Sequence, residues 1–147
     1  MIYLKLLGIE NGERKVSKIF ILLFMIMMHI VDDYYLQGIL AKMKQKSWWE
    51  ENAPNKLYRK DYLMALFMHS FSWAFSIMLP LAIYFKFQIG ISFLIIFLCN
   101  VILHMWTDNL KANKKTINLI EDQITHLLQI WTTYALLLYT IPAIIAN

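Results

Sequence analysis

The sequence predicts an all-α membrane protein, a four-helix transmembrane bundle with a polar His/Asp cluster at one membrane face. Of the 147 residues, 59% are hydrophobic, against about 45–50% in a typical soluble domain. The apolar residues form four segments, each close to the roughly 20 residues that a helix needs to cross a bilayer. Each segment carries one of the four histidines near an end. We therefore expect one integral membrane domain over residues 1–147.

The first helix is expected over residues 17–40. Its uninterrupted apolar part, residues 19–28, is too short to cross a bilayer alone. Four polar side chains follow it: His29, Asp32, Asp33 and Gln37. This segment spans only if its polar end faces the protein interior rather than lipid.

The other three helices are expected over residues 62–85, 87–106 and 124–146. His69 lies near the start of the second, His104 near the end of the third, and His126 near the start of the fourth. The link around Lys86 is very short, so the second and third helices should form an antiparallel hairpin. Cys99 lies inside an apolar run, and we expect it to be a buried thiol.

The two long connections determine the expected orientation. Residues 41–61 carry six basic side chains and residues 107–123 carry three, against four in the N-terminal segment up to Lys18 and one in the short link. The positive-inside rule then places both long connections in the cytoplasm and both termini outside, in the cytoplasmic (inner) membrane. Trp48 and Trp49 lie among the lysines, which is typical of a segment at the membrane interface.

Three aspartates lie four residues from a histidine, and on a helix such a pair shares one face. In an up-down-up-down bundle, all of these helix ends meet at the same membrane face, here the cytoplasmic one. Imidazoles and carboxylates that converge from several helices form a metal site in helical bundles. The candidate metal ligands are His29, Asp33, His69, His104, Asp108, Asp122 and His126.

Seven ligands suit one or two divalent metal ions, and a mixture of His and Asp suits Zn, Mn or Fe(II). Asp32 could replace Asp33 as a ligand, because position i+3 also shares the face. Gln37 could hydrogen-bond a ligand or a substrate, or only be solvated. Lys111 could neutralise an anionic substrate, or be an ordinary solvated lysine. The alternative to a metal is a buried ionic network that fixes the register of the helices.

Several of these motifs together resemble a family of small integral membrane proteins of bacteria and phages that has no established activity. The matching strings are HIVDDYYLQ (29–37), a mid-chain histidine, HMWTDNLK (104–111) and EDQITHL (121–127). The family pattern is H-x3-D-aromatic-x2-Q, His, H-x3-D-x2-K and D-Q-x2-H. The resemblance implies that Asp33, followed by the aromatic Tyr34, is the first aspartate ligand. It supports a site and implies no reaction.

The first functional hypothesis is a hydrolase. Metal ions would activate water against a phosphoester or another ester, and the basic connections favour an anionic lipid or a lipid-linked substrate. The second hypothesis is a structural or interaction protein whose helices are held together by a metal or by ion pairs. The third, a metal-ion transporter, conflicts with the lack of a polar path across the membrane. We expect membrane lipids and no nucleic acid as partners, and leave a homo-oligomer open.

Overall fold

The computed structural model describes residues 9–10, 13–14 and 17–140, and these fold almost entirely as helices. Before the first helix, the two-residue strands β1 (Ile9–Glu10) and β2 (Glu13–Arg14) pair antiparallel. The α-helices are α2 (Lys18–Val31), α3 (Leu40–Met43), α4 (Lys46–Asn52), α5 (Asp61–Tyr84), α6 (Ile91–Asn109) and α7 (Leu119–Ala135). Three π-helical turns and one 3-10 turn extend them: η1 (Asp32–Leu36), η3 (Leu110–Lys114), η4 (Leu136–Thr140) and η2 (Lys56–Tyr58).

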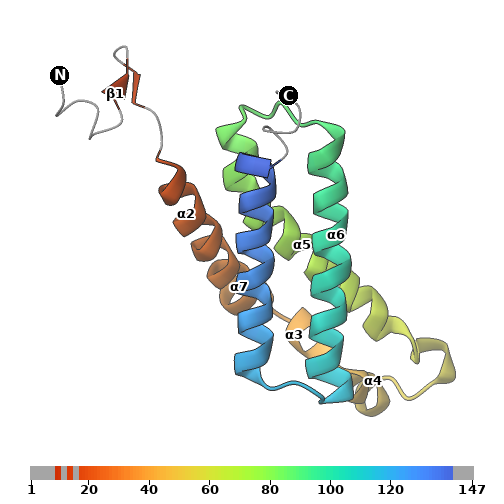
Figure 1. The fold of residues 1–147 in the computed structure, drawn as a ribbon. Helices are drawn as coiled ribbons and strands as arrows, with labels where there is room; N and C mark the ends of the chain where they lie inside the picture. The colour runs from red at the N-terminus through yellow and green to blue at the C-terminus, as the bar shows by residue number, and fades with distance from the viewer. Residues whose placement is uncertain (1–8, 11–12, 15–16, 141–147) are drawn as a thin grey trace.

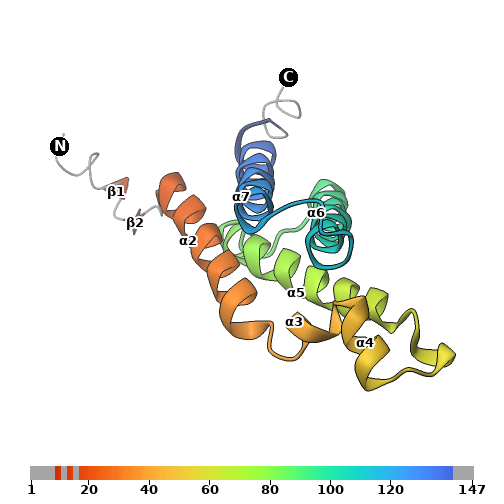
Figure 2. The same ribbon diagram turned by 90° about the horizontal axis from the view of Figure 1, so that it is seen from below.

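The long helices α2, α5, α6 and α7 pack around one apolar core. Figure 1 shows α6 and α7 side by side, with α5 slanting behind them. Helix α2 lies on the side of α7 that is opposite α6. The view from below separates α2 from α6, with α5 in contact with both (Figure 2). The centre of the core is completely buried and consists of Met25, Trp73, Ile77, Leu81 and Ile130.

Three helices are long and apolar enough to cross a membrane: Lys18–Leu36, Lys56–Tyr84 and Ile91–Lys114. Their outward side chains are large and apolar, as in a lipid-facing surface; examples are Leu23, Phe71, Phe75, Leu98 and Ile102. The expected fourth span is the helix α7 with η4, which ends its described part at Thr140. This helix is not among those long and apolar enough to cross a membrane. The rest of the predicted segment lies outside the described residues.

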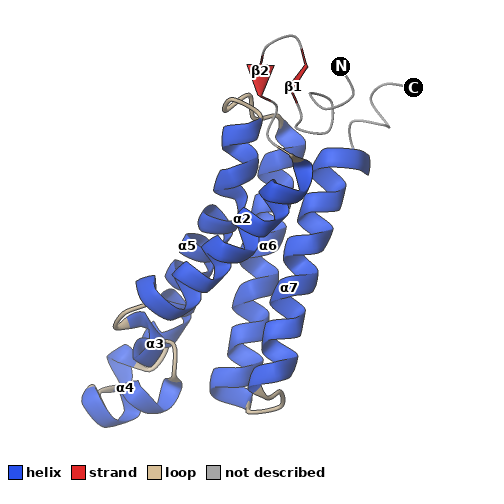
Figure 3. Cartoon of the chain, turned by 90° about the vertical axis from the view of Figure 1, so that its left-hand side faces the viewer, coloured by secondary structure: helices blue, strands red, loops and turns tan. Residues whose placement is uncertain are grey.

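The first predicted helix is broken. The α-helix ends at Val31, the π-turn η1 follows, and Gly38 adopts a left-handed backbone with φ of 53°. Glycine has no Cβ to oppose that conformation. The chain therefore turns, and the short helices α3 and α4 run along the same end of the molecule as the α6–α7 connection (Figure 3).

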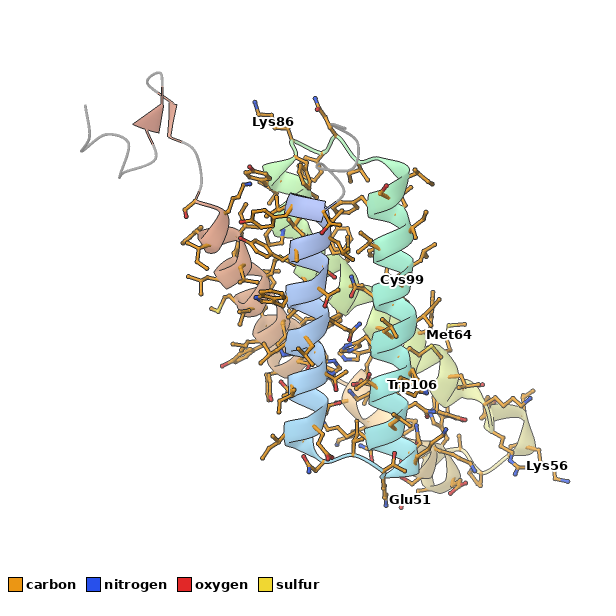
Figure 4. All side chains as sticks on the ribbon, in the orientation of Figure 1. Glu51, Lys56, Met64, Lys86, Cys99 and Trp106 are labelled. Carbon is orange, nitrogen blue, oxygen red and sulfur yellow. The ribbon has the colours of Figure 1, made fainter. Side chains whose placement is uncertain are left out.

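Two further expectations are corrected. The third helix begins at Ile91 rather than near residue 87, because Lys86 and Phe87 are left-handed, with φ of 53° and 59°. Cys99 is exposed on the outer side of α6, because the inward positions of that helix fall at Asn100, Val101 and His104. Figure 4 shows Lys86 at one end of the molecule and Glu51 and Lys56 at the other.

Candidate metal centre

Four helices bring the predicted polar residues together at the end of the bundle opposite the α5–α6 turn. His29 comes from α2, His69 from α5, His104 from α6 and His126 from α7, and each is at most 2% exposed. Asp108 lies in the last turn of α6 and Asp122 in the first turn of α7, and both are buried. Asp33 lies in η1 with its side chain 8% exposed. All seven candidate ligands therefore gather in one region.

A first group that could hold a metal ion consists of Asp33, His69 and His104. Nε2 of His69 lies 3.2 Å from Nε2 of His104 and 3.3 Å from Oδ1 of Asp33. Donor atoms about 2.0–2.1 Å from a tetrahedral zinc lie about 3.3 Å from one another. The observed separations fit that spacing.

A second group consists of His104, Asp108 and His126. Asp108 connects the two groups, because its Oδ1 lies 3.5 Å from Nε2 of His126 and its Oδ2 lies 3.4 Å from Nε2 of His69. A neutral imidazole has a single lone-pair nitrogen, so His104 can serve only one ion through Nε2. The two groups would hold one ion between them or one ion each, with Asp108 within reach of both groups.

Several buried polar atoms in this cluster have no hydrogen-bond partner among the described residues. They include Oδ1 of Asp33, Oδ1 of Asp122 and Nε2 of His126. An unpartnered buried acceptor costs about 1–3 kcal/mol, and a cation held by either group would remove that cost at the atoms it binds. Four aspartates (32, 33, 108 and 122) face two paired lysines (44 and 111), and this excess of carboxylate favours a bound cation.

His29 lies beside these groups rather than within them. Nε1 of Trp73 donates to Nδ1 of His29 at 2.8 Å, which makes Nδ1 an acceptor. Nε2 of the neutral ring then carries the proton and donates to Oε1 of Gln123 at 3.1 Å. Both nitrogens are engaged, so His29 can bind a metal only by giving up one of these bonds. The predicted ligand role of His29 is not what this conformation provides.

Asp32 faces the opposite side of the His69 ring from Asp33. Its Oδ1 accepts hydrogen bonds from Ser72 at 2.7 Å and from Ser76 at 3.0 Å. Its Oδ2 lies 3.8 Å from Nδ1 of His69. This separation is too long for a hydrogen bond, so Asp32 acts on the His69 ring only through its charge.

Two lysines pair with the buried aspartates. Nζ of Lys44 lies 2.6 Å from Oδ2 of Asp108, and Nζ of Lys111 lies 2.5 Å from Oδ2 of Asp122. Burial alone would raise the pKa of Asp122, but His126 and Lys111 more than offset it and hold that pKa below its ordinary value. Lys111 thus neutralises a carboxylate of the protein itself.

A pocket of about 410 Å³ opens at this end of the bundle. Asp33 and Asp108 lie at its wall, together with Lys44, Lys111 and Lys115. Gln37 also lines it, and its Nε2 donates to the backbone oxygen of Asp33 and lies 3.4 Å from Nε2 of His69. A small molecule that enters the pocket therefore meets two candidate ligands and three ammonium groups.

Polar side chains continue for two turns below the cluster, farther than we expected from the sequence. Asn100 donates to Thr133 at 2.8 Å, and Gln129 donates to the backbone oxygen of Asn100 at 3.3 Å. Beyond them lie the buried side chains of Met78 and Leu81. The polar region is therefore closed by apolar packing before the other end of the bundle.

Sequence reasoning missed three residues of the site. Lys44 was one of several lysines in a long connection, and nothing marked it as a partner of Asp108. Trp73 lies in an apolar segment, and nothing in the sequence marked it as a hydrogen-bond donor to His29. Gln123 belongs to the quoted D-Q-x2-H string, and that string was the one available signal. Comparison with protein-family models, curated proteins and solved structures found no match.

Proposed function

We propose that this protein is a metal-dependent hydrolase embedded in the cytoplasmic membrane. It would cleave a phosphoester or another ester, carried on a lipid-linked substrate, at the cytoplasmic face. The observation that carries the proposal is the buried cluster of Asp33, His69, His104, Asp108 and His126, whose donor spacing suits a metal and whose edge lines a pocket. Three lysines in the same pocket suit an anionic substrate.

In this proposal, one set of residues would bind the ion and another would bind the substrate. Imidazole with carboxylate suits Zn, Mn or Fe(II), and such an ion supplies Lewis-acid activation of water for attack on the ester. Lys44, Lys111 and Lys115 would donate to the oxygens of a phosphate and balance the charge that develops there. Asp32, 3.8 Å from Nδ1 of His69, would keep that ring oriented.

The test is hydrolysis by the purified protein, supplied with Zn, Mn or Fe(II), of a panel of lipid phosphoesters and carboxylic esters. Asp108→Asn keeps the size of the side chain and removes its charge, and we expect at least a hundredfold loss of turnover. Ile102→Ala, on the exposed outer face of the same helix, is the matched control. Equal turnover in Asp108→Asn and in the control would overturn the proposal.

The second candidate is a structural membrane protein, and the ion pairs favour it. Lys44–Asp108 joins the segment after α3 to α6, and Lys111–Asp122 joins η3 to α7. His29 is fully hydrogen-bonded without a metal. This alternative predicts that His104→Ala lowers the melting temperature while the wild-type protein hydrolyses none of the esters.

A transporter is the third reading and has the least support. The polar side chains end at Asn100 and Thr133, and apolar side chains close the core beyond them. A flux assay with Zn and Mn in proteoliposomes would reveal transport if it occurs.

A further inference from the structure

A second cavity lies between α2 and α7 and differs in character from the lysine-lined pocket. Its volume is about 530 Å³. Most of its wall is apolar or aromatic: Ile26, Ile30, Tyr34, Tyr35 and Leu127, with His29 and Gln123 at the polar end. We call this cavity the α2–α7 groove.

The groove runs along α2, away from the metal cluster. Its lining extends from Tyr35 back to Ile26, which is nine positions along the helix. At the rise of an α-helix, this corresponds to a groove about 13 Å long. This length lies within the candidate span Lys18–Leu36. Ile30 is 41% exposed and Leu127 is 42% exposed, so the groove is open on the side that would face lipid.

The groove and the lysine-lined pocket meet at two residues. Tyr34 and Gln123 line both cavities. Gln123 also contacts the cluster, because its Nε2 lies 3.3 Å from Oδ2 of Asp33 and 3.2 Å from Oδ2 of Asp122. An apolar chain in the groove would therefore place a group attached to its end beside the candidate metal ligands.

The charge of the pocket defines that group. Lys44 and Lys111 each already pair with a carboxylate. Lys115, exposed and left-handed with φ of 54°, forms no ion pair with any described residue. A divalent ion in the cluster would balance the carboxylate charge that Lys44 and Lys111 leave. Lys115 would then give the pocket a net positive charge, which favours an anionic group such as a phosphate.

We infer that the substrate is a lipid phosphate with one chain in the α2–α7 groove and its phosphate in the lysine-lined pocket. The lipid enters sideways from the bilayer, between α2 and α7, and Tyr34 and Gln123 contact it where the chain joins the phosphate. This inference rests on the proposed function for the fate of the phosphate. Its binding geometry can be tested without any turnover.

The experiment uses full-length protein in phosphatidylcholine nanodiscs, with Zn, and dodecyl phosphate that carries a photoreactive diazirine in its chain. After illumination, mass spectrometry maps the adducts. We expect them to concentrate on Ile26, Ile30 and Leu127. Unlabelled dodecyl phosphate should reduce them about tenfold, while dodecanol and inorganic phosphate should compete much less, because each supplies only half of the interaction.

Two variants locate the chain and the phosphate separately. Ile30→Trp fills the groove and should lower the adducts about tenfold, whereas Leu94→Trp, exposed on α6, should leave them unchanged. Lys115→Gln should weaken competition by dodecyl phosphate. Metal content and the melting temperature, measured for every variant, show whether each one is folded.

Three results would overturn the inference. Adducts spread equally over the outer faces of α2, α5 and α6 would show ordinary lipid contact. Competition by inorganic phosphate as strong as by dodecyl phosphate would show a site for free phosphate. Unchanged adducts in folded Ile30→Trp would show that the chain lies elsewhere. If none of these three results is observed but no ester is hydrolysed, the inferred lipid site stands and only the proposed hydrolysis fails.

Discussion

Trp73 determines the positions of two histidines at once. Its indole N–H donates to His29, and its ring stacks on His104 with centroids 4.1 Å apart and planes 16° apart. Trp73 is completely buried. It therefore fixes which nitrogen of His29 carries the proton and holds the His104 ring in place beside His69.

Trp73→Phe separates these two roles. Phenylalanine can still stack on His104, but Nδ1 of His29 loses its donor. We expect the free energy of unfolding to fall by about 1–2 kcal/mol, because a buried acceptor is left unsatisfied. Metal content should stay at the wild-type level. A large loss of metal would instead show that the hydrogen bond from Trp73 to His29 is needed for metal binding, and would contradict the separation of the two roles.

Lys44 compensates a carboxylate that is almost completely buried. The side chains of Lys44 and Asp108 are 13% and 3% exposed. Lys44→Met keeps most of the apolar stem and removes the charge, so metal-free protein should lose about 3–5 kcal/mol of stability. Bound metal should recover part of the loss. Thermal unfolding with and without Zn measures both effects.

The matched control is an exposed pair nearby. Lys46 and Glu50 lie 3.6 Å apart with side chains 44% and 63% exposed. Glu50→Gln should leave the melting temperature nearly unchanged, because solvent screens such pairs. A similar effect of Lys44→Met and Glu50→Gln would contradict the importance of burial at Asp108.

At the level of single residues, periodicity predicted which side chains gather, but not which atoms of those side chains contact one another. His29 and Asp33 do share a face, and so do His104 and Asp108. Lys44 and Trp73 could not be found in this way, because their partners are 64 and 44 residues distant in the chain. Contacts at that range depend on how the helices cross.

Among the structural elements, the π-turn η1 carries two adjacent aspartates that contact different parts of the site. A π-helix carries one more residue per hydrogen-bonded turn than an α-helix and is frequent at functional sites. In η1, Asp32 faces Ser72 and Asp33 faces His69.

The start of α7 positions the last pair of polar residues. Asn118 accepts hydrogen bonds from the backbone N–H groups of Ile120 and Glu121, and the Glu121 side chain accepts from the backbone of Asn118. This capping box immediately precedes Asp122 and places His126 one turn later.

Asn118→Ala should therefore lower the free energy of unfolding by about 1 kcal/mol and weaken metal binding. The measurement is thermal unfolding together with a metal titration. Asn55→Ala, which removes the cap of the short turn η2 away from the cluster, should leave the metal titration unchanged. Equal effects of the two variants on metal binding would contradict the role assigned to α7.

On the scale of the whole molecule, three of the four expected spans correspond to helices long and apolar enough to cross a membrane, and the fourth does not. Helix α7 carries polar side chains on its inner face, such as Gln129 and Thr133, which lower its mean hydropathy. Those side chains are buried against α6. A scale that counts every residue alike cannot distinguish a polar residue that faces a neighbouring helix from one that faces lipid.

The positive-inside rule also makes a prediction at this scale. In a Cys99→Ala background, a cysteine at Lys56 should be labelled by an impermeant maleimide only from the cytoplasm, and a cysteine at Lys86 only from outside. Figure 4 shows these residues at opposite ends of the molecule. The reverse labelling would place the cluster at the outer face and exclude a cytoplasmic substrate.

The most direct test of the account is the metal content of the purified protein, measured by elemental mass spectrometry. We predict one or two equivalents of Zn, Mn or Fe per chain, held by the two groups that share His104. His104→Ala should lose it, and Ile102→Ala should keep it. No bound metal in wild-type protein, even after reconstitution with each ion, would contradict the account and leave a bundle held by ion pairs alone.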